Sequence, residues 1–153
     1  MNLISHHAFC LFYFTLFCFN YIYNYCNYNH TPPFSVSYIG ATKNFATTNE
    51  GDLDGGSRGW TIYSESGDVI YDSGNELEWL TVKVGHYPDE RSGNKGNEPE
   101  NVLYAKISFG VDDDEDTEEF QFLFVASERS NVVFVYEVSD PTNPELIQIL
   151  PVG

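Results

Sequence analysis

The C-terminal part of the chain alternates between apolar and polar positions with the two-residue period of β-strands. Residues 120–126, FQFLFVA, place phenylalanines on one face and leucine and valine on the other, which predicts a central strand. Turn residues separate four such runs, so we expect one four-stranded antiparallel sheet. The expected strands are 101–108, 120–126, 132–138 and 145–150, the last of them at the outer edge.

The preceding part of the chain shows the same kind of pattern. Short apolar runs at 34–39, 45–50, 60–63 and 69–72 predict strands, and the turn at 64–68 offers a glycine for a positive φ. Two segments, 52–59 and 85–97, are too rich in glycine and polar residues for regular structure. No helical period is evident in residues 31–153, so we expect an all-β body without helices.

An internal repeat connects the two halves. The run 45–50, a loop and the run 60–63 correspond to 125–128, a loop and 134–136, about 80 residues further on. A propeller blade takes roughly 40–50 residues, so we expect insertions around 85–97 and 110–119. The repeat favours antiparallel four-stranded blades of an incomplete β-propeller, with a β-sandwich-like fold as the alternative. Residues 31–153 would supply two to three blades, whereas closure needs at least about four.

Residues 1–30 differ from the rest, because they contain no Lys, Arg, Asp or Glu and carry an aromatic run at 9–19. Three interpretations stay open: a signal-like or anchor segment, the translation of AT-rich non-coding DNA, and a membrane span interrupted by asparagines. In each case the segment lies outside the fold. All three cysteines are here, so the body has no disulfide framework or thiol nucleophile.

The formal net charge of −16 limits the choice of partners. Such a chain repels phosphate backbones and anionic membranes, so we expect divalent cations or basic protein surfaces rather than nucleic acid. The acidic run 112–116 is typical of a solvated loop, with weak calcium contact as the alternative. Because the outer strand 145–150 has little charge, we also expect self-association through open sheet edges.

Four glutamates are the candidate metal ligands. Glu50 and Glu128 follow equivalent strands of the repeat, and Glu98 and Glu100 precede the first strand of their sheet. In a closed propeller such strand ends converge on the central channel, where carboxylates could hold calcium. The alternative is that each glutamate caps a turn or pairs with an arginine of the adjoining loops, namely Arg58, Arg91 or Arg129.

Catalytic signatures are sparse in the body. His86 is its only histidine, and a lone loop histidine is more typical of a surface position than of a general base. No Gly-x-Ser-x-Gly elbow occurs. The segment that starts at Asp52 does not match the twelve-residue calcium loop of an EF-hand, because its twelfth position is Tyr63 rather than glutamate. Glycoside hydrolysis by paired carboxylates stays open, since sequence spacing does not give their separation. We therefore expect a non-enzymatic protein.

Six motifs in one order resemble the choice-of-anchor I family over residues 42–151: they lie at 49–52, 55–58, 70–78, 91–100, 128–130 and 136–144. Its members are also called mesenchyme-specific cell-surface glycoproteins and are sometimes labelled alkaline-phosphatase-like. The resemblance implies a propeller-like, extracellular or surface-attached protein, linked in animals to calcified skeletons. The chain departs from the family in length, lacking most blades, and in a shortened segment between Tyr87 and Arg91.

Three functions follow from these observations. The first is an acidic, non-enzymatic module outside the cell or on its surface, binding calcium and associated with matrix or biomineral. The second, implied by the family label, is a fragment of a calcium-dependent phosphoesterase. The third is a truncated gene product without independent function.

Overall fold

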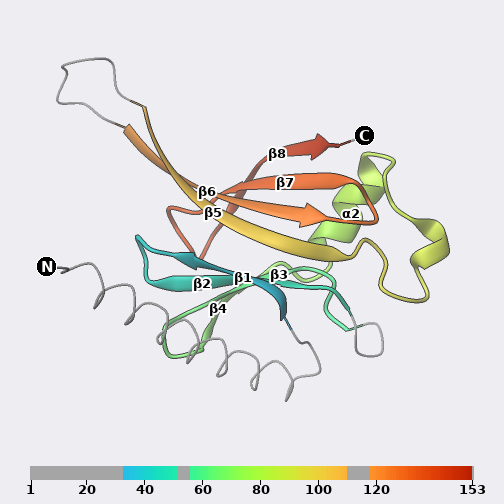
Figure 1. The fold of residues 1–153 in the computed structure, drawn as a ribbon, viewed down its shortest axis with the longest axis horizontal. Helices are drawn as coiled ribbons and strands as arrows, with labels where there is room; N and C mark the ends of the chain where they lie inside the picture. The colour runs from blue at the N-terminus through green and yellow to red at the C-terminus, as the bar shows by residue number, and fades with distance from the viewer. Residues whose placement is uncertain (1–32, 52–55, 110–117, 153) are drawn as a thin grey trace, which may run out of the picture.

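The fold consists of two four-stranded antiparallel sheets, each built from consecutive strands (Figure 1). We describe residues 33–51, 56–109 and 118–152 of a computed structural model of the chain. The first sheet has the order β1-β2-β3-β4 and the second β5-β6-β7-β8, so the all-β prediction and the predicted strands are confirmed. Their bounds are β1 Pro33–Ile39, β2 Asn44–Asn49, β3 Trp60–Tyr63, β4 Val69–Asp72, β5 Pro99–Phe109, β6 Glu118–Ser127, β7 Val132–Glu137 and β8 Glu145–Pro151.

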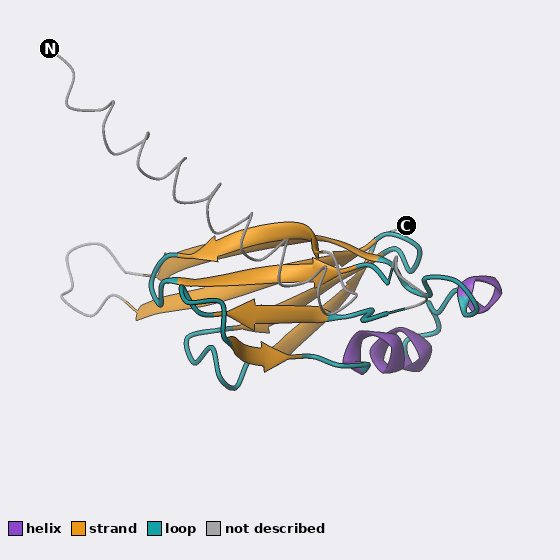
Figure 2. Cartoon of the chain, turned by 90° about the horizontal axis from the view of Figure 1, so that it is seen from below, coloured by secondary structure: helices purple, strands orange, loops and turns teal. Residues whose placement is uncertain are grey.

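The expectation of a body without helices is wrong. Helix α2, Glu76–Lys83, and the 3₁₀ helix η1, Asp89–Arg91, lie between the sheets in sequence and at one end of the strands in space (Figure 2). Leu77 and Thr81 face the core, but Trp79 and Val82 are exposed, and this mixture hides the helical period. End signals were available: acidic residues in the first turn, a lysine in the last and a glycine after it.

The two sheets have matching registers. β1 and β5 both begin with a proline, Pro33 or Pro99, and both have an irregularity directly after it. A second irregularity divides Ile62 from Tyr63 in the first sheet and Val135 from Tyr136 in the second. The strands that repeat in the sequence are therefore the second and third strands of each sheet, as the repeat predicts.

This correspondence shows how the sheets stack. Ala46 on β2 pairs with Ile62 on β3, and Phe124 on β6 pairs with Val135 on β7, so Ala46 corresponds to Phe124. Ala46 faces the shared core, whereas on β6 the core residue is the neighbouring Leu123. Equivalent faces of the two sheets thus point in the same direction, as in a repeating stack, and not toward each other.

The space between the sheets widens from the first strands to the last. β5 lies next to β1, where the Ser35 hydroxyl accepts a hydrogen bond from the Val102 amide at 3.3 Å and the Ser37 hydroxyl accepts one from the Tyr104 amide at 3.0 Å. Further out, the Trp60 ring fills the gap, with its centroid 4.7 Å from that of Tyr136. Small residues therefore lie at the close approach and large aromatic residues at the wide side.

Helix α2 lies at the wide side of this space and is linked to both sheets through the carboxylate of Glu76. The hydroxyls of Tyr71 on β4 and Tyr136 on β7 donate to Glu76 Oε2 at 3.3 and 3.0 Å. Burial and the nearby Glu76 carboxylate raise the pKa of Tyr71 to about 12 and raise the pKa of Tyr136 as well. Both phenols therefore stay protonated and tie the helix to the two sheets.

Candidate metal site at the junction of the two sheets

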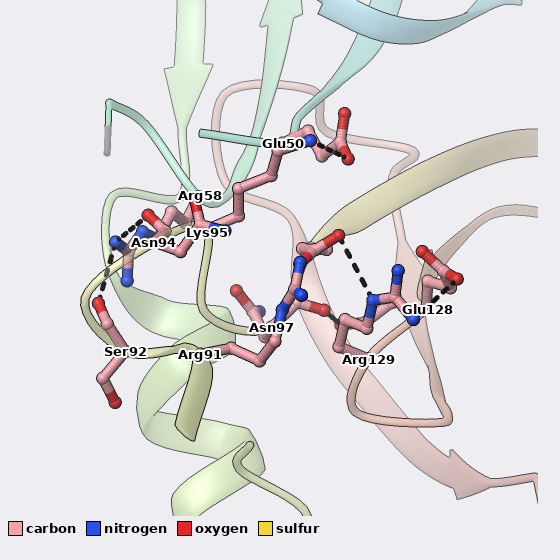
Figure 3. Close-up of polar contacts among 11 residues, drawn as sticks. Glu50, Arg58, Arg91, Ser92, Asn94, Lys95, Asn97, Glu128 and Arg129 are labelled. Carbon is pink, nitrogen blue, oxygen red and sulfur yellow. Dashed lines mark hydrogen bonds and ion pairs between the residues drawn. The ribbon is translucent and has the colours of Figure 1, made fainter. Parts of the chain in front are cut away.

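Three polar segments meet at the end of the strands near α2 (Figure 3). They are the end of β2 with Glu50, the segment 91–100 that leads into β5, and the turn 128–131 between β6 and β7. Arg58 holds the middle segment, because its guanidinium donates to the carbonyl oxygens of Ser92 and Asn94 at 3.0 and 2.6 Å. Several of the motifs that carry the family resemblance thus come together in one place.

A glycine permits this packing. Arg58 also forms an ion pair with Glu78 of α2 at 3.0 Å. Gly96 lies against this pair with φ 62, and a Cβ at that position would come within 2.4 Å of Glu78 Oε1 and 2.8 Å of Arg58 Nη1. A larger residue at position 96 would therefore separate the ion pair or move the segment.

Three of the four predicted metal ligands converge. One carboxylate oxygen each from Glu50, Glu98 and Glu100 lies within 4.8 Å of the other two. Glu50 and Glu98 are buried, with 5% and 2% of their surface exposed. The fourth predicted ligand, Glu128, lies near enough to Glu100 to raise the pKa of the Glu100 carboxyl. The structure therefore brings together carboxylates from both sheets that are up to 78 positions apart in the sequence.

Cationic side chains occupy part of this cluster. Lys95 Nζ lies 2.8 Å from Glu50 Oε1, Arg91 pairs with Glu98 Oε1, and Arg129 lies 3.4 Å from Glu98 Oε2. Arg129 also pairs with Glu128 at 3.3 Å. Pairing with Arg91 and Arg129, the predicted alternative, is therefore present, but pairing of these glutamates with Arg58 is not, since Arg58 binds Glu78.

Lys95 is a residue that sequence reasoning missed. It comes from the polar segment that was expected to be an irregular insertion, and nothing in the local pattern links it to Glu50, 45 positions earlier. Four carboxylates and three cationic side chains thus lie together at this junction.

Glu100 shows the effect of bringing these carboxylates together. Burial raises the pKa of Glu100, and its interaction with Glu128 and the negative charges of Glu50 and Glu98 raise it further. Like charges close together disfavour ionisation, so the fold holds this carboxylate in a position that an added cation would stabilise.

The backbone at Glu98 has a rare conformation. Glu98 has φ 49, in the left-handed region that costs a non-glycine residue free energy. Its carbonyl accepts a hydrogen bond from the Glu128 amide at 2.9 Å, and the carbonyl of Asn97 accepts one from the Ser127 hydroxyl. These bonds fix the segment against the end of β6 and turn the Glu98 side chain into the junction.

An open hollow of about 250 Å³ borders the cluster. Its polar lining includes Glu100 and Glu128, and its apolar lining comes from Ala126, Val132, Val133 and Val152. The hollow therefore gives solvent access to Glu100 and Glu128, whereas Glu50 and Glu98 are not among its lining residues.

The other candidates have structural positions or lie outside the described residues. His86 Nδ1 lies 3.0 Å from the carbonyl oxygen of Ser130, which links the end of α2 to the turn 128–131. Residues 52–55, the run 112–116 and the N-terminal segment 1–30 lie outside the described residues. Within the described residues no helix is long and apolar enough to cross a membrane.

Two stacked four-stranded meanders with a partly buried carboxylate cluster at their junction define an all-β repeat module. The model of the choice-of-anchor I domain matches residues 27–141, which is most of the chain, so the chain belongs to the choice-of-anchor I family. The resemblance drawn from the motifs is thereby confirmed. No curated protein and no solved structure matches the chain significantly.

Proposed function

We propose that the chain is a non-enzymatic, propeller-type module of the cell surface or extracellular space that binds calcium through Glu50, Glu98, Glu100 and Glu128. The observation that carries the proposal is the convergence of three carboxylate oxygens within 4.8 Å of one another. Calcium takes oxygen ligands at 2.3–2.6 Å, so two oxygens on one ion lie at most about 5 Å apart. The mutual distances of the three oxygens lie within this limit, so a small movement of the side chains would bring all three to one ion.

The propeller part of the proposal is supported by the stacking. Blades of a propeller pack with equivalent faces in one direction and widen away from the axis. The matching registers of the two sheets and the serine-lined approach of β1 and β5 agree with this arrangement. Membership of the choice-of-anchor I family supports a location at the surface or outside the cell.

Calcium would compete with the internal cations. The ammonium of Lys95 and the guanidinium of Arg91 bind the oxygens of Glu50 and Glu98 that the ion would use. This competition lowers the affinity toward the range of about 10⁻⁴–10⁻³ M, in which extracellular calcium modules work. Association with calcified matrix would follow from the same site, because carboxylates at a protein surface can also bind calcium in a mineral.

The test is a calorimetric titration of the purified chain with calcium chloride. We expect binding near millimolar concentration, at least tenfold weaker in Glu100→Gln and tighter in Lys95→Gln, in which the competing charge is gone. Glu65→Gln, in the exposed β3–β4 turn, is the control and should bind like the wild type. Absence of heat in the wild type and in Lys95→Gln would refute the proposal and leave the cluster as an ion-pair lock between the sheets.

The phosphoesterase alternative stays a prediction of the family label. It would be established by calcium-dependent hydrolysis of a phosphomonoester that is lost in Glu100→Gln. Equal turnover in the wild type and Glu100→Gln, or none in either, would end it.

A further inference from the structure

The turn that carries Lys95, residues 91–96, is compact. The backbone amides of Asn94 and Gly96 both donate to the carbonyl oxygen of Arg91, at 2.9 and 3.0 Å. From this turn the Lys95 side chain reaches the glutamate that follows β2 (Figure 3). The position of the ammonium therefore depends on the contacts that hold the turn.

Arg58 supplies these contacts from the loop before β3. Its guanidinium donates to the carbonyl oxygens of Ser92 and Asn94 at 3.0 and 2.6 Å, and Asn94 directly precedes Lys95. Glu78 of α2 pairs with the same guanidinium at 3.0 Å, and only 14% of the Arg58 side chain is exposed. The planar guanidinium has a rigid fork of donors that can bind two carbonyls and a carboxylate at once, whereas the ammonium of a lysine acts as a single point of charge.

Two glycines allow Arg58 to lie between the two sides of the ion pair. A Cβ at Gly51 would come within 2.9 Å of Arg58 Cγ, and a Cβ at Gly96 would come within 2.8 Å of Arg58 Nη1. Gly51 directly follows Glu50, and Gly96 directly follows Lys95. Arg58 thus packs against the backbone beside both partners of the Lys95–Glu50 pair.

The candidate calcium ligands are attached to their sheets by other contacts. Glu50 directly follows β2, and Glu100 is a residue of β5. The carbonyl of Glu98 accepts a hydrogen bond at 2.9 Å from the turn between β6 and β7. Loss of the Arg58 contacts should therefore release Lys95 more than it displaces the ligands.

We propose that Arg58 regulates the calcium affinity of the junction by holding the Lys95 ammonium on Glu50, where the ammonium competes with the ion. This inference rests on the proposed function, because it concerns the same carboxylates. While Arg58 holds the turn, an internal cation occupies Glu50; when the turn is released, Lys95 leaves more easily and calcium binds at a lower concentration. Because Glu78 orients Arg58, the calcium affinity is linked to helix α2.

The first experiment is a calorimetric titration of the full chain with calcium chloride. We expect Arg58→Lys, which keeps the charge but loses the fork, to bind calcium several-fold more tightly than the wild type. In the Lys95→Gln background the same change should alter the affinity by less than about twofold, because two changes that act through one contact do not add. Lys106→Gln removes a positive charge from an exposed pair with Glu119; it is the control and should bind like the wild type.

Other roles of Arg58 give a different pattern. If Arg58 positioned the ligands, Arg58→Lys would weaken calcium binding. If it acted through a contact other than Lys95, its effect would be the same in the wild type and in Lys95→Gln. Either result overturns the proposal. Gly96→Ala, whose Cβ disturbs the Arg58–Glu78 pair from the side of the turn, replaces Arg58→Lys if circular dichroism shows that Arg58→Lys does not fold.

A second experiment, without calcium, separates this inference from the proposed function. Urea unfolding with a chelator measures the loss of stability caused by Lys95→Gln, in the wild type and in Arg58→Lys. We expect a smaller loss in Arg58→Lys, because the released ammonium supports Glu50 less. Equal losses would show that Arg58 does not hold Lys95, even if calcium binds. If neither the wild type nor Lys95→Gln binds calcium, the proposed function fails and the regulatory role with it, whereas the unfolding data alone decide whether Arg58 holds Lys95.

Discussion

Glu98 offers the sharpest test of the junction, because it pairs with two arginines and only 2% of its side chain is exposed. The change Glu98→Gln keeps the size of the side chain and removes its charge. Breaking a buried ion pair by removing one partner costs about 3–5 kcal/mol. Arg91 and Arg129 are 31% and 45% exposed and can regain water, so we expect a smaller loss, about 2 kcal/mol.

The matched control is Glu128→Gln. Glu128 pairs with the same Arg129 at 3.3 Å, but its side chain is 41% exposed. Exposed ion pairs contribute about 0–1 kcal/mol, so this variant should lose less than about 0.5 kcal/mol. The two variants remove the same charge and differ in how deeply the carboxylate is buried.

Urea unfolding followed by tryptophan fluorescence measures both values, since Trp60 lies in the core and reports on its loss. For a domain of this size a loss of 2 kcal/mol corresponds to a fall in Tm of about 8 °C. A calcium chelator is added, so that residual calcium does not contribute to the measured stability. If Glu98→Gln and Glu128→Gln are equally stable, burial of Glu98 does not strengthen the contribution of its ion pairs to the free energy of unfolding, and the description of the junction is wrong.

Three further predictions concern the same fold. Because the pKa of Glu100 is raised, the folded state binds its proton more tightly than the unfolded state does. The stabilisation from this carboxyl group is therefore present at low pH and is lost as the pH rises through the folded-state pKa. We expect Glu100→Gln to raise the Tm at pH 7 without calcium and to leave the Tm at pH 4 unchanged. Gly96→Ala should cost about 2 kcal/mol in urea unfolding, since φ 62 and the Glu78–Arg58 pair both oppose a Cβ, and a stable variant would contradict that geometry. Leu123→Ala should cost about 3 kcal/mol and Leu103→Ala less than about 0.5 kcal/mol, because Leu123 is fully buried and Leu103 is 61% exposed; equal losses would place both on the same kind of face.

The strands could be predicted because their signals are local. β3 and β4 begin and end where the alternation and the flanking turns predict, and Gly67 in the turn between them has φ 89, as its position in the hairpin requires. β8 pairs with β7 alone, as expected for an outer strand. β6 is central in its sheet as predicted, although its phenylalanine face is only partly covered.

Helix α2 and the cations of the junction could not be predicted in the same way. Only eight residues form the helix, and exposed Trp79 and Val82 interrupt its apolar face. Lys95 and Arg91 acquire their roles from Arg58, which draws the segment 91–100 against the strand ends from a position more than 30 residues earlier. Such contacts are set by tertiary packing, which a one-dimensional pattern does not contain.

The glutamates were predicted because the repeat places them at equivalent positions. Glu50 and Glu128 both follow the second strand of a sheet, and strand ends in a stack of sheets meet at one edge. The repeat also gives the direction of stacking, since it aligns Ala46 with Phe124 on opposite sides of the shared core. The same alignment therefore accounts for both the position of the candidate metal site and the direction in which the sheets stack.

A crystal structure of the chain grown with calcium chloride, with anomalous data collected at long wavelength, tests the central claim most directly. We expect an anomalous peak between the carboxylates of Glu50, Glu98 and Glu100 at oxygen distances of about 2.3–2.6 Å, with the Lys95 ammonium displaced from Glu50. Lys95 and Arg91 still bound to Glu50 and Glu98, with no peak among the carboxylates at millimolar calcium, would contradict the account.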